Sequence, residues 1–126
     1  MDMQNLGEME ERFAALIWQN VPVGSGRLVE LAAAAFGWKK STTYTMLKRL
    51  CARGLFENRG GTVHALVTQE EYQLRQGERF LEARFGGSLP LFVAAFTRRG
   101  KLKEDEVEEL RRLIDSYPGS SGPKGE

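Results

Sequence analysis

Few residues in this chain could support catalysis or bind a metal. The 126 residues include one histidine, His64, and one cysteine, Cys51. A structural zinc site needs four ligands and a disulfide needs two cysteines, so the sequence predicts no metal, no cofactor and no internal disulfide. Paired acids such as Glu70 and Glu71 suit the start of a helix, where the dipole attracts them, better than acid–base catalysis. We therefore expect a protein that is not an enzyme.

A local surplus of positive charge predicts binding instead. The chain as a whole carries a net charge of +1. Residues 27–60, however, carry seven Lys or Arg and two acids, whereas residues 1–26 and 61–126 carry net charges of −3 and −1. Such a surplus indicates a surface for a polyanion, and the alternative is a chance clustering of surface cations.

A helix predicted to begin near Ser41 would present this charge. With Thr43, Leu47 and Leu50 facing the core, its opposite side carries short hydroxyls beside long cations. Such a face can enter a DNA major groove, where Arg49 can pair with a guanine; the alternative is an ordinary solvated face. The predicted DNA-binding residues also include two lysines before the helix and an arginine beyond it: Lys39, Lys40, Ser41, Thr42, Thr45, Lys48, Arg49 and Arg59.

Two earlier helices should pack against this one. Apolar residues at helical spacing predict the first over about 5–19. The second should begin with Ser25 as its N-cap and close near Gly37, and Ser41 or a neighbouring threonine should cap the third. Gly54 is placed to end the third helix in a left-handed conformation.

An extended hairpin should follow the helices. Segments 55–59 and 62–67 alternate as strands do, and Gly60-Gly61 between them is a two-residue hairpin signal. Three helices and then a hairpin are the order of a winged helix-turn-helix. We therefore predict a mostly α protein with a winged-helix DNA-binding domain over residues 1–67.

The remaining chain predicts a three-helix domain over residues 68–117. A capping box at Thr68 opens a helix to about Phe85, and two further helices should span 88–100 and 104–117. The Gly/Ser-rich tail, 118–126, should be disordered.

The first of these helices has apolar residues on two sides, and each of the two apolar faces must pack against another element. An identical chain is the simplest cover, giving a homodimer with a two-fold interface. The alternative is a monomer whose helices fold back on the winged domain. The predicted dimer interface consists of Leu74, Leu81, Phe85, Leu91, Phe92, Phe96, Leu110, Leu113 and Ile114.

Several short motifs, each present once, follow one another from about Glu8 to Tyr117. They include Ile17-Trp18, Thr43-Tyr-Thr-Met-Leu-Lys-Arg-Leu50 and Val67-Thr-Gln-Glu-Glu-Tyr72. Together these motifs resemble the BlaI/MecI/CopY (penicillinase repressor) family of winged-helix transcriptional repressors. The resemblance implies a bacterial homodimer, cytoplasmic and nucleoid-associated when bound, that occupies a palindromic operator on double-stranded DNA. It implies control of a resistance or stress-response operon.

Two departures from the family bear on the inducing signal. Copper-responsive members carry paired cysteines near the C-terminus, and residues 118–126 have none. Beta-lactam-responsive members are cleaved at an Asn-Phe junction in the fifth helix through a membrane sensor protease. That protease is a partner the resemblance implies, yet this chain reads Leu89-Pro-Leu-Phe-Val93 there. Apolar runs are too short to span a membrane, so direct membrane insertion is not expected.

Two alternatives stay open. The chain could keep the winged fold as a protein-interaction adaptor without DNA binding. Cys51 lies beside the expected core stripe, where a small buried hydrophobe is one interpretation. A redox sensor, with an exposed and activated thiolate, is the other.

Overall fold

The computed structural model describes residues 6–119. Residue 5, at the predicted start of the first helix, and residues 120–126 of the predicted disordered tail lie outside the described residues. The chain divides into two compact units, with the boundary after Phe80. The division of function between residues 1–67 and 68–117 stays a prediction.

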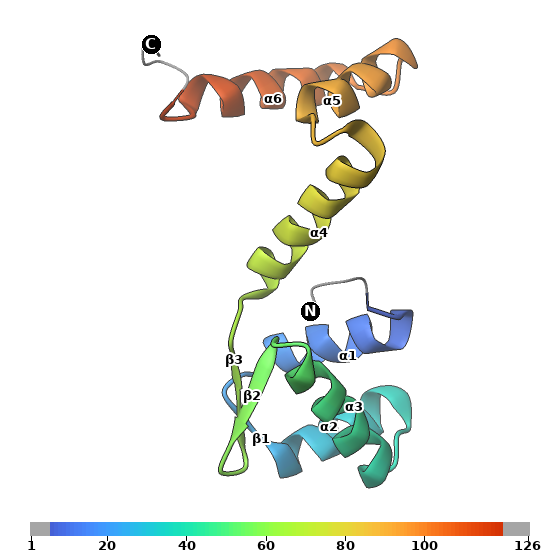
Figure 1. Cartoon of the computed structure of the whole chain (residues 1–126), viewed down its shortest axis with the longest axis vertical. Helices are drawn as coiled ribbons and strands as arrows, with labels where there is room; N and C mark the ends of the chain where they lie inside the picture. Colours follow the sequence, from blue (N-terminus) through green and yellow to red (C-terminus); the bar gives the residue numbers. More distant parts are fainter. Residues whose placement is uncertain (1–5, 120–126) are drawn as a thin grey trace. The chain divides into compact units, whose positions relative to one another are not determined.

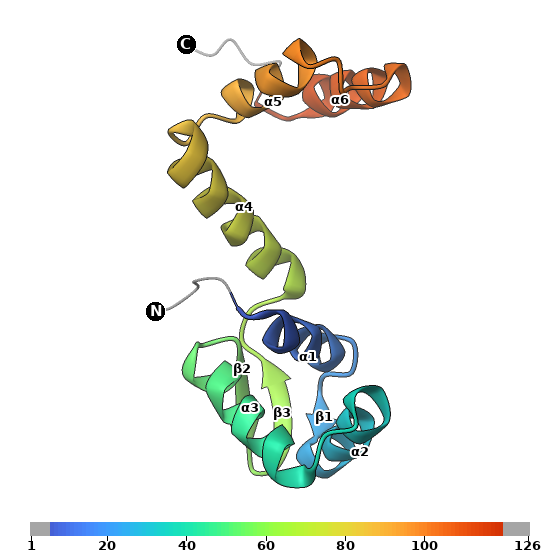
Figure 2. The same cartoon turned by 90° about the vertical axis from the view of Figure 1, so that its right-hand side faces the viewer.

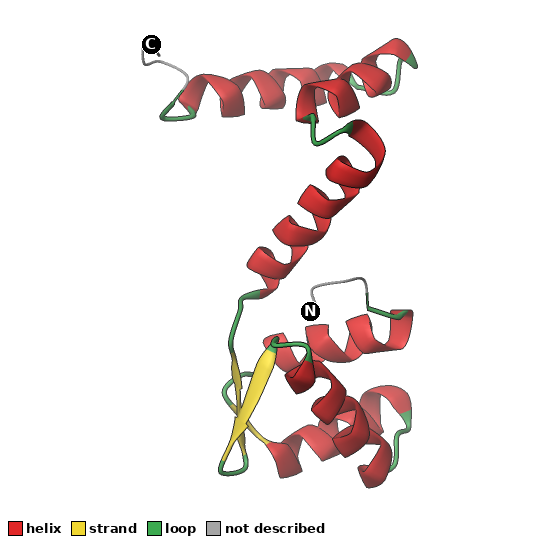
Figure 3. Cartoon of the chain, viewed as in Figure 1, coloured by secondary structure: helices red, strands yellow, loops and turns green. Residues whose placement is uncertain are grey.

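Residues 8–65, within the first unit, form three helices and a three-stranded antiparallel sheet (Figures 1 and 3). In this sheet β3 lies between β1 and β2 (Figure 2). The elements are α1 (Glu8–Trp18), β1 (Val23–Gly24), α2 (Ser25–Phe36), α3 (Lys40–Ala52), β2 (Phe56–Arg59) and β3 (Thr62–Ala65). The hairpin β2–β3 lies alongside α3, as Figure 2 also shows. This is the predicted winged helix-turn-helix, with β1 as an added edge strand.

Apolar residues at helical and strand spacing build the core of this unit. The buried side chains include Phe13 and Ile17 of α1, Leu28 of α2, and Leu50 of α3. Burying such large side chains is the main favourable term for a domain of this size. Phe13 also contacts Trp38 edge to face, with ring centroids 5.0 Å apart.

Glycines set the two turns that frame α3 and the hairpin. Gly54 has φ +84°, so α3 ends in the left-handed conformation that its position predicts. Gly60 and Gly61 have φ +58° and +93°, as the first and second central residues of a two-residue hairpin require. The hairpin prediction is confirmed, with Asn58 paired to Val63 and Arg59 to Thr62.

Two predicted helix caps are wrong. The N-cap of α2 is Gly24 and that of α3 is Lys39, so Ser25 and Ser41 lie inside the first turns. Ser25 is displaced from the cap position because β1, which was not predicted, pairs Gly24 with Thr62. The first helix is also shorter than predicted, since Gly7 is its N-cap.

Three helices follow the hairpin: α4 (Gln69–Phe85), α5 (Leu89–Arg98) and α6 (Glu104–Ser116). The capping box of α4 is confirmed, because Thr68 N donates to Glu71 Oε1 at 2.8 Å and Glu71 N donates to Thr68 Oγ1 at 3.0 Å. Ser88 caps α5 by accepting from Leu91 N at 3.0 Å. These local hydrogen bonds fix where each helix begins.

Candidate nucleic-acid interface

The outer side of α3 carries five of the predicted DNA-binding residues on one exposed face. Thr43, Leu47 and Leu50 are buried against the core, and the helical period therefore turns the opposite side outward. We call this surface the α3 face; it consists of the exposed residues Ser41, Thr42, Thr45, Lys48 and Arg49.

A shallow hollow of about 250 Å³ lies on one flank of the α3 face. It is lined by Ser41, Thr42, Thr45, Met46 and Arg49. Hydroxyls and a guanidinium around a small hollow can donate to base edges or phosphate oxygens. Met46 is half-buried and forms part of this wall.

Both predicted lysines at the start of α3 are exposed. Lys39 is the N-cap, with extended backbone, and Lys40 is the first helical residue. The first N–H groups of a helix have no partner within the helix and attract anions, so two cations here add to a favourable place for a phosphate.

The eighth predicted residue, Arg59, lies on β2 at the hairpin turn rather than on α3. Its side chain is exposed and pairs with Glu57, with Arg59 Nε 3.3 Å from Glu57 Oε2. The turn itself is closed by Gly61 N, which donates to Asn58 Oδ1 at 3.0 Å. The structure thus holds a partly neutralised cation at the tip of the wing.

Ser25 links the wing to α3. Its backbone N–H donates to the carbonyl of Gly61 at 2.8 Å, and its hydroxyl lies 3.1 Å from the hydroxyl of Tyr44. One residue at the start of α2 therefore contacts both the hairpin turn and α3. No local sequence signal could show this, because both partners are distant in sequence.

Glu10 of α1 lies at the edge of the α3 face, beside Arg49. Its Oε2 is 3.7 Å from Arg49 NH1 and its Oε1 is 3.9 Å from Arg53 NH2. The backbone N–H of Gly7 donates to Oε1 at 3.0 Å, which orients the carboxylate. The side chain of Arg49 is still 61% exposed. Sequence reasoning found neither Glu10 nor Arg53, since their proximity depends on the packing of α1 against α3.

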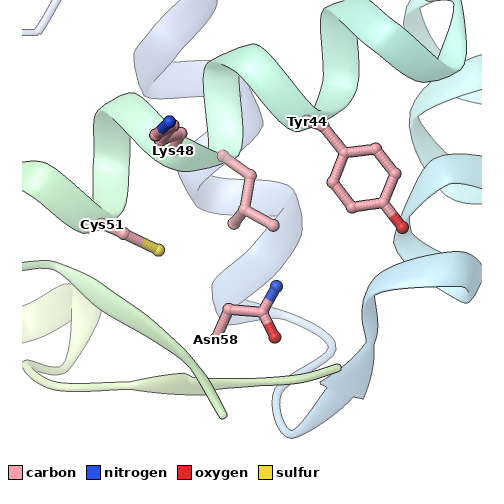
Figure 4. Close-up of a pocket in the computed structure, with 5 residues that line it drawn as sticks. Tyr44, Lys48, Cys51 and Asn58 are labelled. Carbon is pink, nitrogen blue, oxygen red and sulfur yellow. The ribbon is translucent and has the colours of Figure 1, made fainter. Parts of the chain in front are cut away.

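Cys51 lines an open pocket of about 380 Å³ between α3 and β2, together with Tyr44, Leu47, Lys48 and Asn58 (Figure 4). Burial raises the pKa of the Cys51 thiol; a hydrogen bond with the Asn58 backbone lowers the pKa by a smaller amount, and the carboxylate of Glu57 adds a still smaller increase. A thiol with a raised pKa is a weak nucleophile at neutral pH. The pocket therefore favours the interpretation of Cys51 as a packing residue over that of a redox sensor.

Within residues 6–119, no three His, Cys, Asp or Glu side chains are grouped to hold a metal.

Beyond Tyr72, which belongs to the core of the first unit, the last three helices have apolar side chains but no core of their own. None of residues 73–119 is buried. Phe92 packs edge to face against Phe85 and Phe96, with centroids 5.2 and 5.0 Å away. Of the predicted interface residues, the exposed ones are Leu74, Leu91, Phe96, Leu113 and Ile114, and the half-buried ones are Leu81, Phe85, Phe92 and Leu110. Leu89 and Tyr117, outside that set, are exposed as well.

No helix within residues 6–119 combines the length and apolar character that crossing a bilayer requires.

A helix-turn-helix with an exposed, basic third helix and a β wing defines a winged-helix protein of the transcription-regulator class. Comparison with known families makes this specific. The model of the penicillinase repressor family matches residues 6–116, and the chain belongs to that family of transcriptional repressors. The resemblance inferred from the motifs is thereby confirmed.

Individual relatives are distant but similar along most of their length. The chain is 22% identical over 114 residues to the methicillin resistance regulatory protein MecI of Staphylococcus aureus (strain Mu50 / ATCC 700699), covering 87% of this chain and 93% of that protein. It is 22% identical over 116 residues to the penicillinase repressor of Bacillus licheniformis, covering 89% and 91%.

Proposed function

We propose that this protein is a homodimeric, sequence-specific DNA-binding repressor that acts by occupying a palindromic operator. The observation that carries the proposal is the α3 face, where small hydroxyls and two long cations are exposed on one side of a helix whose other side is buried. Small side chains let a helix enter the major groove, and the cations contact phosphates or guanines.

The cations fall into three groups by their proposed contacts with DNA. Lys39, Lys40 and Lys48 contact phosphates and supply most of the affinity, while Arg49 reads a base. Arg59 touches a flanking backbone or the minor groove from the wing. Because phosphate contacts release counterions, binding should weaken steeply as salt rises.

Dimerisation is proposed from the last three helices. Residues 73–119 include no buried residue and gain little free energy from their own packing, so their exposed apolar side chains favour association. A second copy would cover them with an isologous interface and place two α3 faces on two half-sites.

We further propose that the protein acts in the bacterial cytoplasm and is nucleoid-associated when bound to DNA. A membrane sensor protease is the partner implied by the family. Because Leu89–Val93 lacks the Asn-Phe junction, we propose that release from the operator uses another signal or another cleavage position. The operon would be one for resistance or stress response.

Fluorescence anisotropy with a labelled random duplex tests the proposal. We expect binding at low salt that weakens with a slope of about −0.9 per phosphate contacted in a plot of log K against log salt. Lys48→Ala should reduce the slope by about 1. Lys101→Ala removes the same charge between α5 and α6 and should leave the slope unchanged. Binding that is absent, or insensitive to salt, would favour a protein-interaction adaptor and contradict the proposal.

A further inference from the structure

A single carboxylate lies between two arginines at the edge of the α3 face. Glu10 is 17% exposed and belongs to α1, whereas Arg49 belongs to α3 and Arg53, one turn further on, is the C-cap of α3. Gly7 N donates to the Oε1 atom that is close to Arg53, leaving Oε2 as the atom nearest Arg49. The carboxylate is therefore fixed in place by its own helix and not by the arginines alone.

The contact with Glu10 occupies one part of the Arg49 guanidinium. NH1 lies 3.7 Å from Glu10 Oε2 of α1 and 3.7 Å from Met46 Sδ, one turn earlier on α3, so both contacts involve the same nitrogen. Nε and NH2 form the other edge of the planar group. That edge has the fork geometry that pairs with the O6 and N7 atoms of guanine.

We propose that Glu10 is a positioning residue that determines sequence specificity by orienting Arg49 toward a base edge. The inference rests on the proposed DNA-binding function and adds to it a residue outside α3. An arginine held in one orientation loses less side-chain entropy on pairing with a guanine than a free one does. The same arginine is also less free to turn toward a neighbouring phosphate.

Glu10 should therefore have opposite effects on two kinds of binding. Its negative charge lies near the α3 face and lowers affinity for any duplex, because it repels phosphates and neutralises part of the local positive charge. By orienting Arg49, it raises affinity for the cognate sequence relative to others. A role in folding alone would change both affinities in the same direction.

The experiment compares Glu10→Gln with the wild-type protein on two labelled duplexes. One is the duplex enriched from a random pool by the wild-type protein, and the other is a scrambled duplex of the same composition. We expect Glu10→Gln to bind the scrambled duplex more tightly, and the ratio of the two affinities to fall at least about fivefold. Glu8→Gln removes the same charge from an exposed position of α1 and should leave the ratio unchanged.

A double-mutant cycle shows whether Glu10 acts through Arg49. In an Arg49→Ala background, adding Glu10→Gln should change the affinity ratio by less than about twofold. An unchanged ratio for Glu10→Gln alone, or an equal fall with Arg49 already removed, would overturn the inference. If Glu10→Gln does not fold, Glu10→Asp, which keeps the charge and shortens the side chain, should lower the ratio without tightening scrambled-duplex binding.

Different results would contradict the proposed DNA-binding function and the proposed role of Glu10. If the wild-type protein itself shows no salt-dependent binding and no preference among duplexes, the proposed DNA-binding function is wrong. If the wild-type protein discriminates and Glu10→Gln discriminates equally well, only the role of Glu10 is wrong.

Discussion

The indole Nε1 of Trp18 donates a hydrogen bond of 2.9 Å to the carbonyl oxygen of Val67, 49 residues further along the chain. The same ring packs against Phe56 and Tyr72, with centroids 5.0 and 5.5 Å away. The end of α1 is thus joined to the segment that leaves the wing and begins α4.

Trp18→Phe should destabilise the winged helix by removing this donor while keeping an aromatic ring. The carbonyl of Val67 would lose its partner at a half-buried position, which costs about 1–3 kcal/mol. Urea unfolding followed by circular dichroism measures the change. Leu66→Ala, at an exposed neighbouring position, should cost less than about 0.5 kcal/mol. Equal losses for the two variants would contradict the role of the hydrogen bond.

The contacts of Ser25 predict a coupled pair of substitutions. Ser25→Ala and Tyr44→Phe each remove one partner of the same 3.1 Å hydroxyl contact, so each should lower the free energy of unfolding by about 0.5–1.5 kcal/mol. Because they remove one interaction, the double variant should lose clearly less than the sum of the two. Additive losses would mean that the hydroxyls do not interact in solution.

These two relationships mark the limit of prediction from sequence. The capping box at Thr68, the Gly60-Gly61 turn and the left-handed Gly54 were predictable, because each is fixed by residues within a few positions. β1 was not, because a two-residue strand has no periodicity and exists only through pairing with β3. Likewise the exposure of Arg49 follows from helical spacing, whereas its contact with Glu10 depends on how α1 packs against α3.

The raised pKa of Cys51 predicts a pH dependence of stability. Since burial favours the neutral thiol, the folded chain binds this proton more tightly than the unfolded chain does. The resulting stability is fully present below the pH at which an unfolded-chain thiol ionises, and it is lost as the pH rises through the raised pKa. In urea unfolding over a pH series, the free energy of unfolding of Cys51→Ala should fall less than that of the wild type as the pH becomes alkaline. Parallel plots of the free energy of unfolding against pH for the two proteins would contradict this.

The exposed side chain of Leu113 on α6 tests dimerisation. In a monomer, Leu113→Glu places a charge in water and should change little. In the proposed dimer it buries an unpaired carboxylate, so the dimer should dissociate at concentrations where the wild type is dimeric. Arg112→Gln changes the net charge equally on the far side of α6 and serves as the control. Sedimentation equilibrium gives the masses, and a monomeric wild type would contradict the interface.

Selection of duplexes from a random pool by the wild-type protein tests the central claim most directly. Two α3 faces related by two-fold symmetry should enrich an inverted repeat whose half-sites lie about one or two helical turns apart. An enriched single half-site would contradict the dimeric arrangement, and a pool without enrichment would contradict sequence-specific repression.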